Sequence, residues 1–279
     1  MTSVRFSRLV QAALIYAILL ITAFAVLVPI FWIVMSSLNP GKTLLSTTFF
    51  PDRLSLEHYE YLFTKTDFPR WFRNTLKVAT GNMLLSTFLV ITSAYAFSRF
   101  RFPGRRSGLL AMLILQMFPG FMGMVAIYVL LLHVGLLDTL WGLILVYAGG
   151  AVPYGTWLAK GYLDGIPRSI EEAAFLDGAS HTQVFFHVTL PLTFPILTFV
   201  ALTNFIGPWM DFILARIVLR STANKTLALG LFEMVTGRGN TEFTTFAAGA
   251  VIIALPITLL SFFLQRFLIE GLTAGANKT

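Results

Sequence analysis

The sequence contains no cysteine and unusually few charged residues. Of its 279 residues, 12% are Asp, Glu, Lys or Arg and 56% are hydrophobic, with a mean hydropathy of +0.77. Ordinary soluble domains carry about 25% charged residues, so this chain lacks the polar surface needed to face water on all sides. The missing cysteines exclude disulfides and thiolate metal sites. The four histidines do not lie near other residues in a metal-ligand pattern, and we interpret them as tolerated surface or interface residues.

Six stretches contain no charged residue, and each is at least 21 residues long. Roughly 20 apolar residues span the hydrocarbon core as a helix, and one charge at mid-membrane costs about 2.5–3.5 kcal/mol. The predicted spans are residues 9–35, 78–98, 107–132, 139–159, 188–210 and 243–265. The sequence therefore predicts an all-α integral membrane protein with six transmembrane helices in a single domain, residues 1–279. The first stretch exceeds the apolar region of a signal peptide, about 7–15 residues, so we interpret it as a retained helix.

The distribution of basic residues predicts the orientation of the chain. An even number of spans places both termini on one side, and the 20 Lys and Arg residues then divide equally between the two sides. The positive-inside rule gives most weight to short loops, and "RFRFPGRR" (99–106) has four arginines in eight residues. We predict that both termini are cytoplasmic. The net charge of +7 thus reflects membrane topology, and no basic and aromatic pattern indicates nucleic-acid binding.

Polar and aromatic residues inside the spans are candidates for contact with a transported molecule, because such groups usually face protein or water rather than lipid. The candidate substrate-path residues are Gln116, Tyr147, Asn204 and Trp209. For Asn204 and Trp209, interhelical hydrogen bonds and an interfacial tryptophan are the simpler alternative. Central prolines predict kinked helices in spans three to six; they are Pro119, Pro153, Pro195 and Pro256. Kinked packing and helices bowed around a cavity that opens and closes both fit this pattern.

A charged segment, "SIEEAAFLDGASHTQVFFHVTLP", separates spans four and five. Ser169 followed by Glu172 has the spacing of a capping box, in which each side chain bonds the other residue's backbone amide. Gly178 can take the left-handed conformation that ends a helix, and Ser180 followed by Gln183 has capping-box spacing again. The pattern predicts a pair of short helices joined at Gly178 within a cytoplasmic loop, residues 169–190.

The first of these helices is too short to be stable alone in water, so it needs a partner surface. Ile170, Ala173 and Ala174 share one face, and the small alanines allow close approach of another protein. The alternative is a helix that rests on the bilayer surface. Such helices usually carry Lys and Arg, so the acidic residues favour a docking element.

"EEAAFLDGA", followed by "LP" twelve residues after Gly178, resembles the EAA signature of the membrane subunits of bacterial and archaeal ABC importers. Further blocks resemble the second permease subunit of maltose/maltodextrin-type importers, a carbohydrate branch of that family. These blocks are "YAFSRFRFPG" (95–104), "QMFP" (116–119), "ALPIT" (254–258) and "EGLTAG" (270–275). The similarity extends from about residue 70 to the end.

The resemblance implies a non-catalytic permease that forms half of a translocation pathway and receives motion from a separate ATPase. The ATPase-coupling residues it implies are Glu171, Glu172, Ala173, Ala174, Asp177 and Gly178. A cytoplasmic tail, residues 266–279, would reach the interface between two ATPase subunits through Gly271, Leu272, Thr273, Ala274 and Gly275. The stretch near residues 222–242 would contact an extracytoplasmic sugar-binding protein.

The implied setting is the plasma membrane of a bacterium or archaeon. The chain would pair with a second, different permease and two ATPase subunits, with ATP and magnesium bound by the ATPase and no cofactor in this chain. The implied substrate is an oligosaccharide, with maltose or maltodextrin first. Galacto-oligosaccharides and raffinose-type sugars are the alternatives.

Two other classes of protein remain as alternatives. A stand-alone ion-coupled carrier or channel should bury ionisable groups at mid-membrane, and none of the six stretches contains an acidic or basic residue. An integral-membrane enzyme would need a catalytic cluster, which the sequence does not show. Gly41-Lys42-Thr43 matches the end of a P-loop, but Ser36 stands where the motif requires its first glycine, so we reject nucleotide binding there.

Overall fold

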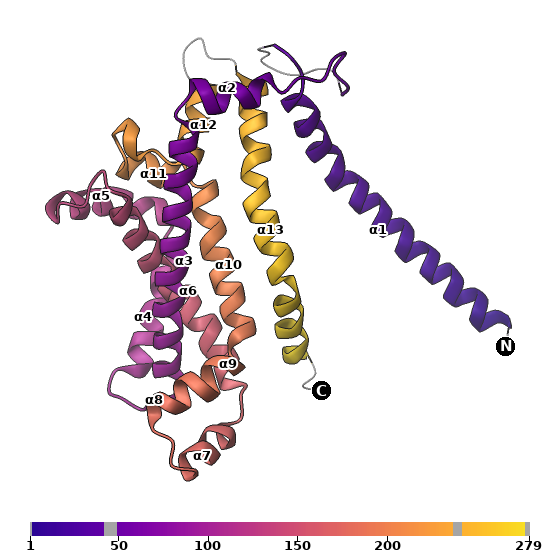
Figure 1. The fold of residues 1–279 in the computed structure, drawn as a ribbon. Helices are drawn as coiled ribbons and strands as arrows, with labels where there is room; N and C mark the ends of the chain where they lie inside the picture. Colours follow the sequence, from indigo (N-terminus) through magenta and orange to yellow (C-terminus); the bar gives the residue numbers. More distant parts are fainter. Residues whose placement is uncertain (1, 42–48, 237–241, 277–279) are drawn as a thin grey trace. The chain divides into compact units, whose positions relative to one another are not determined.

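The computed structural model describes residues 2–41, 49–236 and 242–276, with the side chains of residues 2–9 and 266–276 outside that description. The described residues form helices and contain no strand (Figure 1). The helices are α1 Thr2–Ser37, α2 Glu57–Lys65, α3 Phe68–Arg99, α4 Arg105–Met117, η1 Gly120–Gly123, α5 Met124–His133, α6 Leu140–Asp164, α7 Arg168–Leu176, α8 His181–Val184, η2 Phe185–Thr189, α9 Leu190–Leu192, α10 Phe194–Met210, α11 Ile213–Val218, η3 Thr222–Asn224, α12 Leu227–Thr236 and α13 Phe243–Ala276. The predicted all-α class is confirmed.

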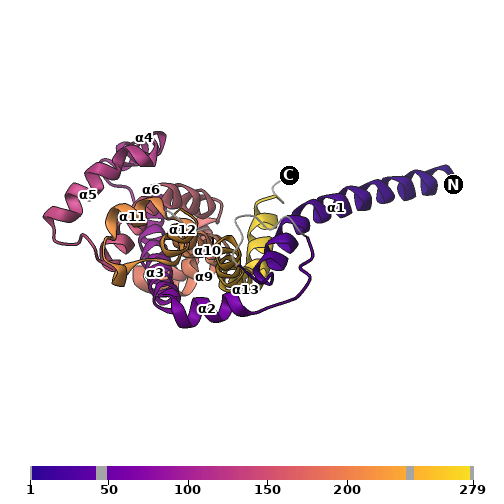
Figure 2. The same ribbon diagram turned by 90° about the horizontal axis from the view of Figure 1, so that it is seen from above.

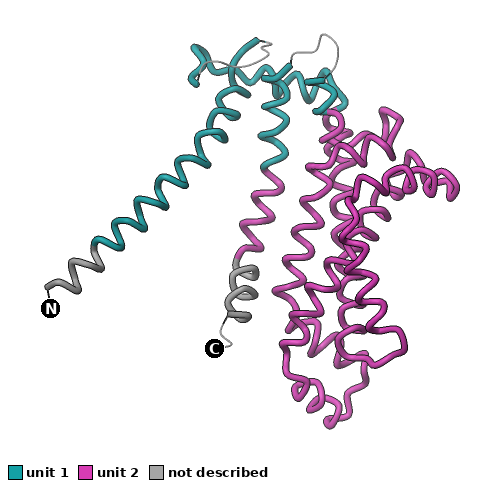
Figure 3. The backbone as a smooth tube through the Cα atoms, turned by 180° about the vertical axis from the view of Figure 1, so that it is seen from behind, with its two compact units in different colours: residues 1–67, 231–254 teal, residues 68–230, 255–279 magenta. Residues whose placement is uncertain are grey.

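The chain divides into two compact units, coloured separately in Figure 3. The first comprises Met1–Asp67 and Leu231–Ala254, and the second comprises Phe68–Gly230 and Leu255–Thr279. In the first unit, His58 is 3% exposed and both of its ring nitrogens have partners. Nδ1 lies 3.1 Å from Thr245 Oγ1, and Nε2 lies 2.9 Å from the Asn39 carbonyl. His58 is thus a buried structural histidine, whereas the sequence indicated a surface or interface residue.

The second unit is built around α3, α6 and α10. One apolar cluster joins the three helices through Val90 and Ala94 of α3, Leu163 of α6 and Val200 of α10. At Gly155 a Cβ atom would lie 2.5 Å from Val90 Cγ2. The small-residue segment of α6 therefore allows α3 to approach closely, as small residues do in membrane helices. α4 and α5 extend to one side of this bundle (Figure 2).

Four of the six predicted spans lie within single long helices that are apolar enough to cross a membrane. These are Val10–Ser37, Phe68–Arg99, Leu140–Asp164 and Phe243–Gln265. The other two are bent pairs: Arg105–Met117 with Gly120–His133 turns by 97°, and His181–Leu192 with Phe194–Met210 turns by 75°. The first bend is much sharper than an ordinary proline kink. Phe118 has extended backbone torsions because proline disfavours the α conformation in the residue before it.

Candidate functional site

The segment between α6 and α10 begins with the nine-residue helix α7. Its N-cap is Pro167, which has no side-chain hydrogen bond to the helix start, so the capping box predicted for Ser169 and Glu172 is wrong. The fixed φ of Pro167, −57°, already suits the entry to a helix. The helix consequently starts one residue before Ser169, which places the serine inside the first turn.

The end of α7 confirms the prediction at Gly178. This glycine has a φ of +87°, and the Ala179 amide donates to the Ala174 carbonyl at 3.0 Å. The Gly178 amide donates to the Phe175 carbonyl, also at 3.0 Å. These two bonds define a Schellman motif, which satisfies the last carbonyls of the helix and requires a left-handed residue at this position.

The second predicted cap is also confirmed. The Ser180 amide donates to Gln183 Oε1 at 2.8 Å, and the Gln183 amide donates back to Ser180 Oγ at 3.4 Å. The α8 helix that starts here continues through a π-helical turn, η2, in which the Leu190 amide donates to the Phe185 carbonyl. Single π-turns inside longer helices are frequent at functional sites.

One exposed side of α7 is apolar. Ile170 is 43% exposed, Leu176 is 89% exposed and Ala173 lies between them, also exposed. The sequence placed Ala174 on this face, but the structure half-buries it and puts Leu176 there instead. Glu172, Asp177 and Gly178 are exposed as well. These exposed residues make one side of α7 available for contact with another protein.

Glu171 differs from the other predicted coupling residues because it is 5% exposed. Both of its carboxylate oxygens lie 2.9 Å from Arg99 Nε, at the last residue of α3. Thr189, the last residue of η2, donates its hydroxyl to Glu171 Oε1 at 2.8 Å. The two glutamates of the motif therefore have different environments: Glu172 is exposed, and Glu171 is buried and bonded to Arg99 and Thr189.

Further polar contacts tie the ends of α3 and α6 together at the base of α7. Ser98 donates to Asp164 Oδ1 at 2.6 Å, and Arg168 donates to the Ser98 carbonyl at 2.9 Å. Arg99 also donates from Nη2 to the Ile166 carbonyl at 3.3 Å. A small cavity of about 170 Å³ lies beside this network. Its walls include Tyr95, Arg99, Phe100, Arg168, Glu172 and His181.

The candidate substrate-path residues lie on three different helices. The Tyr147 hydroxyl on α6 donates to Asp211 Oδ2 at 2.5 Å, just beyond the end of α10. Asn204 donates to Val200 of its own helix at 2.8 Å, while its carbonyl accepts from Asn82 of α3 at 2.7 Å. Asn204 thus makes the interhelical contact that the sequence offered as an alternative, through its backbone rather than its side chain.

The other two candidates have opposite environments. Trp209 is 1% exposed and packs edge-on against Phe72 at 5.4 Å between ring centroids, with Phe205 on the same helix at 5.8 Å. It is therefore a packing residue of the second unit. Gln116, near the end of α4, is exposed.

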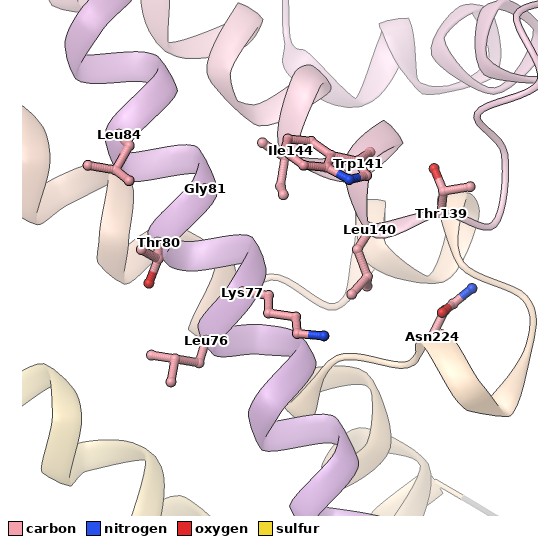
Figure 4. Close-up of a pocket in the computed structure, with 10 residues that line it drawn as sticks. All are labelled: Leu76, Lys77, Thr80, Gly81, Leu84, Thr139, Leu140, Trp141, Ile144 and Asn224. Atoms are coloured by element: carbon pink, nitrogen blue, oxygen red, sulfur yellow. The ribbon is translucent and has the colours of Figure 1, made fainter.

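A larger groove, about 720 Å³, lies between the beginnings of α3 and α6 (Figure 4). Leu76, Lys77 and Leu84 line it from α3, and the exposed indole of Trp141 lines it from α6. Asn224 of η3 completes one side. The sequence gives no signal for this groove, because a lysine just before a span and a tryptophan just inside one are ordinary membrane-boundary residues.

Asp138 is a second site that sequence reasoning missed. Its Oδ1 accepts from the backbone amides of Arg220 and Ser221 at 2.8 and 3.0 Å, and from the Ser221 hydroxyl at 3.1 Å. Burial opposes the charged form, but these bonds prevail and lower the pKa of Asp138. Its φ of +56° is uncommon for a residue other than glycine. Asp138 thus fixes the loop after α11 to the start of α6.

Two features singled out from the sequence cannot be placed. Lys42 and Thr43 of the P-loop-like motif fall outside the described residues. Gly271, Leu272, Thr273, Ala274 and Gly275 fall in the last turns of α13, whose side chains are not described. Within the described residues, no group of three or more His, Cys, Asp or Glu residues could hold a metal ion.

Helices long and apolar enough to cross a membrane, with a short helix that carries an exposed apolar side at one end of the bundle, define an integral membrane protein. Comparison with known proteins shows its class. Residues 87–273 match the family "Binding-protein-dependent transport system inner membrane component". The chain belongs to this family, so it is an inner-membrane permease subunit, and ATP hydrolysis belongs to a separate subunit.

Several known proteins are similar to the chain over nearly its whole length. It is 39% identical to the galactooligosaccharides transport system permease protein GanQ of Bacillus subtilis, covering 97% of each chain. It is 38% identical to the maltodextrin transport system permease protein MdxG of the same organism, covering 98% of each. Among solved structures, a bacterial ABC transporter involved in alginate import matches with a TM-score of 0.79 and 25% identity, covering 91% of this chain and 95% of that one.

Proposed function

We propose that this chain forms half of the translocation pathway of an ABC importer for an oligosaccharide of the maltodextrin type. The observation that carries the proposal is the α7–Gly178–α8 segment, which places an exposed Ile170–Ala173–Leu176 face beyond the end of the α3–α6–α10 bundle (Figure 1). The similarity to a maltodextrin permease at 38% identity supports the substrate class. A galacto-oligosaccharide is the second candidate, favoured by the 39% identity to GanQ.

The proposed topology has six spans, with both termini and the α7–α8 segment in the cytoplasm. Each bent pair counts as one span, so the spans stay at residues 9–35, 78–98, 107–132, 139–159, 188–210 and 243–265. Residues 169–190 form the cytoplasmic loop, and residues 266–279 form the cytoplasmic tail. The support is the spacing of apolar helices and the four arginines of residues 99–106, which favour the cytoplasmic side.

The proposed partners are a second, different permease, two ATPase subunits that bind ATP and magnesium, and an extracytoplasmic sugar-binding protein. The ATPase would contact Glu172, Ala173, Ala174, Asp177 and Gly178 directly, and Glu171 would act from within the protein. The tail residues 271–275 would reach between the two ATPase subunits. The binding protein would contact the stretch near residues 222–242, in which the Asn224 side chain donates to the Asp138 carbonyl at 2.6 Å.

The proposed pathway residues are Tyr147, Asn204, Gln116 and Trp209. In the described conformation Tyr147 is bonded to Asp211, and Trp209 is packed against Phe72. Contact with sugar would therefore require α6 and α10 to separate from these partners during transport. Of the four residues, Gln116 is the one already exposed.

The test is to co-purify the complex, identify its subunits and measure ATP hydrolysis in lipid vesicles with the binding protein present. Maltotriose is expected to stimulate hydrolysis and to accumulate in the vesicles only when ATP is supplied. Stimulation by a β-linked galactose disaccharide without a response to maltotriose would select the second candidate. Sugar uptake by the chain alone, without ATP, would contradict the proposal as a whole.

A further inference from the structure

Arg99, Glu171 and Thr189 come from three elements that are far apart in the sequence. Arg99 ends α3, Glu171 lies in the first turn of α7, and Thr189 ends the π-helical turn η2. Their contacts are short: 2.9 Å from Arg99 Nε to each carboxylate oxygen of Glu171, and 2.8 Å from the Thr189 hydroxyl to Oε1. One carboxylate therefore holds together the end of one membrane helix, the docking helix and the start of another membrane segment.

The three side chains are withdrawn from water. The Arg99 and Glu171 side chains are 6% and 7% exposed, and Thr189 is fully buried. Two buried opposite charges at this distance attract strongly, and breaking one partner leaves the other charged and unpaired. The contact is consequently hard to open during a transport cycle, unlike a surface ion pair that exchanges readily with water.

The arginine also binds the connection between α6 and α7. Its Nη1 donates to Ser98 Oγ at 3.1 Å, and its Nη2 donates to the Ile166 carbonyl at 3.3 Å. A guanidinium is planar and presents donors in a fixed fork, so these bonds also fix its orientation. Lysine, a single point of charge, could not make the same set of contacts.

The surroundings of the three residues contrast with the docking face. Ile170, Ala173 and Leu176 are exposed and have no part in the Arg99–Glu171–Thr189 contact. α7 thus has one side available for a partner protein and another attached to the membrane bundle. Removing the buried contact should leave the docking face intact while loosening the attachment.

We propose that Arg99, Glu171 and Thr189 form a buried clamp that makes α7, the end of α3 and the π-helical turn η2 move as one body. The inference rests on the proposed function, because it assumes that the ATPase pushes on α7. The three are positioning residues, since they are buried within the chain and bond one another. Without the clamp, α7 can move relative to the segments that connect it to α6 and α8. ATP-driven motion of α7 then does not move α3 and α10.

The test uses the reconstituted complex with its partners and compares sugar transported per ATP hydrolysed. Glu171→Gln keeps the size of the side chain and removes its charge. Expected are unchanged co-purification of the ATPase, retained ATP hydrolysis, and a fall of about tenfold in sugar per ATP. A role limited to folding would lower the amount of assembled complex and leave this ratio unchanged.

A second pair of variants keeps the test decisive if Glu171→Gln does not assemble. Thr189→Val preserves shape but removes the hydroxyl donor, and it should lower the ratio about threefold. Thr189→Ser keeps the donor and should restore the ratio of the unaltered protein. The matched control is Arg106→Gln, which removes an exposed charge in the first turn of α4, outside the Arg99–Glu171–Thr189 contact, and should leave the ratio unchanged.

The outcomes separate the two proposals. An unaltered complex that lacks an ATPase, or that shows no ATP-dependent uptake, refutes the proposed function. A working complex in which Glu171→Gln, or Thr189→Val beside Thr189→Ser, retains the full ratio of sugar to ATP refutes the clamp alone.

Discussion

Individual residues set where the α7–α8 segment turns and how the loops are held. Gly178 shows the clearest link from residue to geometry, because its φ of +87° is strained for a side chain although no atom lies within 4 Å of a Cβ placed there. The restriction is therefore in the backbone and not in packing. Asp138, just before α6, fixes the loop that follows α11 by accepting hydrogen bonds from three groups of Arg220 and Ser221.

Gly178→Val should uncouple transport without preventing insertion into the membrane. A left-handed conformation costs an L-residue about 1–2 kcal/mol, and valine, being β-branched, tolerates it poorly, so α7 should lose its fixed direction relative to α8. The measurement is sugar uptake per ATP in vesicles, which should fall several-fold. Gly178→Asn is the matched control, since asparagine accepts this conformation and should retain most coupling. Full coupling in the valine variant would contradict the role of the turn.

Asp138→Asn should destabilise the protein at neutral pH and have little effect at low pH. Because the folded-state pKa of Asp138 is lowered, its stabilisation is present above the unfolded value of about 4 and is lost as the pH falls through the folded-state value. With solvent screening, the loss at pH 7 should be about 1 kcal/mol. Thermal unfolding of the detergent-solubilised protein at pH 7 and at about pH 3 measures the difference. The exposed Asp52→Asn is the control, and an equal loss at both pH values would contradict the assignment.

At the scale of elements, apolar runs predicted where helices lie but not where they break. The Pro119 bend turns a predicted span by 97°, and the bend before α10 turns another by 75°. Hydropathy reports only that a segment is apolar, and a proline allows both a kink and a full break. Caps were predictable where the partners are neighbours, as with Ser180 and Gln183.

The contacts that sequence reasoning missed join residues far apart in the chain. Glu171 fits the acidic first turn of a helix, but its main partner, Arg99, lies 72 residues earlier. Asp138 and Ser221 are separated by 83 residues. Spacing in the sequence carries no signal for such pairs. The exposed side of α7 was predicted with one error. Ala174 lies one turn after the buried Glu171 and is half-buried with it, so Leu176 stands on the exposed side in its place.

Leu176→Glu should weaken attachment of the ATPase while leaving the permease stable. The side chain is 89% exposed, so the substitution should change the stability of the chain by no more than about 0.5 kcal/mol. In the assembled complex the new charge would be desolvated without a partner, and an affinity loss of tenfold or more, about 1.4 kcal/mol, is expected. Titration of the ATPase onto the permease in nanodiscs measures this affinity.

The control is Lys65→Glu, on α2, which should leave the affinity for the ATPase unchanged. Equal affinities of the two variants for the ATPase would show that α7 does not form the interface.

At the scale of the whole molecule, the low content of charged residues is consistent with a chain that acts as a membrane subunit of a larger complex. With 12% charged residues and long exposed apolar helices, it needs lipid and partner proteins to cover its surface. The apolar face of α7 is the exception, because it follows polar connections and lies beside charged residues at the end of the bundle. The partner that we propose for this face is the separate ATPase subunit, in keeping with the membership of the chain in a binding-protein-dependent transport family.

The absence of cysteine permits one direct measurement of this arrangement. A single Leu176→Cys substitution in the otherwise cysteine-free chain is expected to cross-link to the ATPase in the assembled complex. It should react with a membrane-impermeant maleimide only after the cells are opened. Labelling of this cysteine from outside intact cells, or a cross-link that never includes the ATPase, would contradict the account.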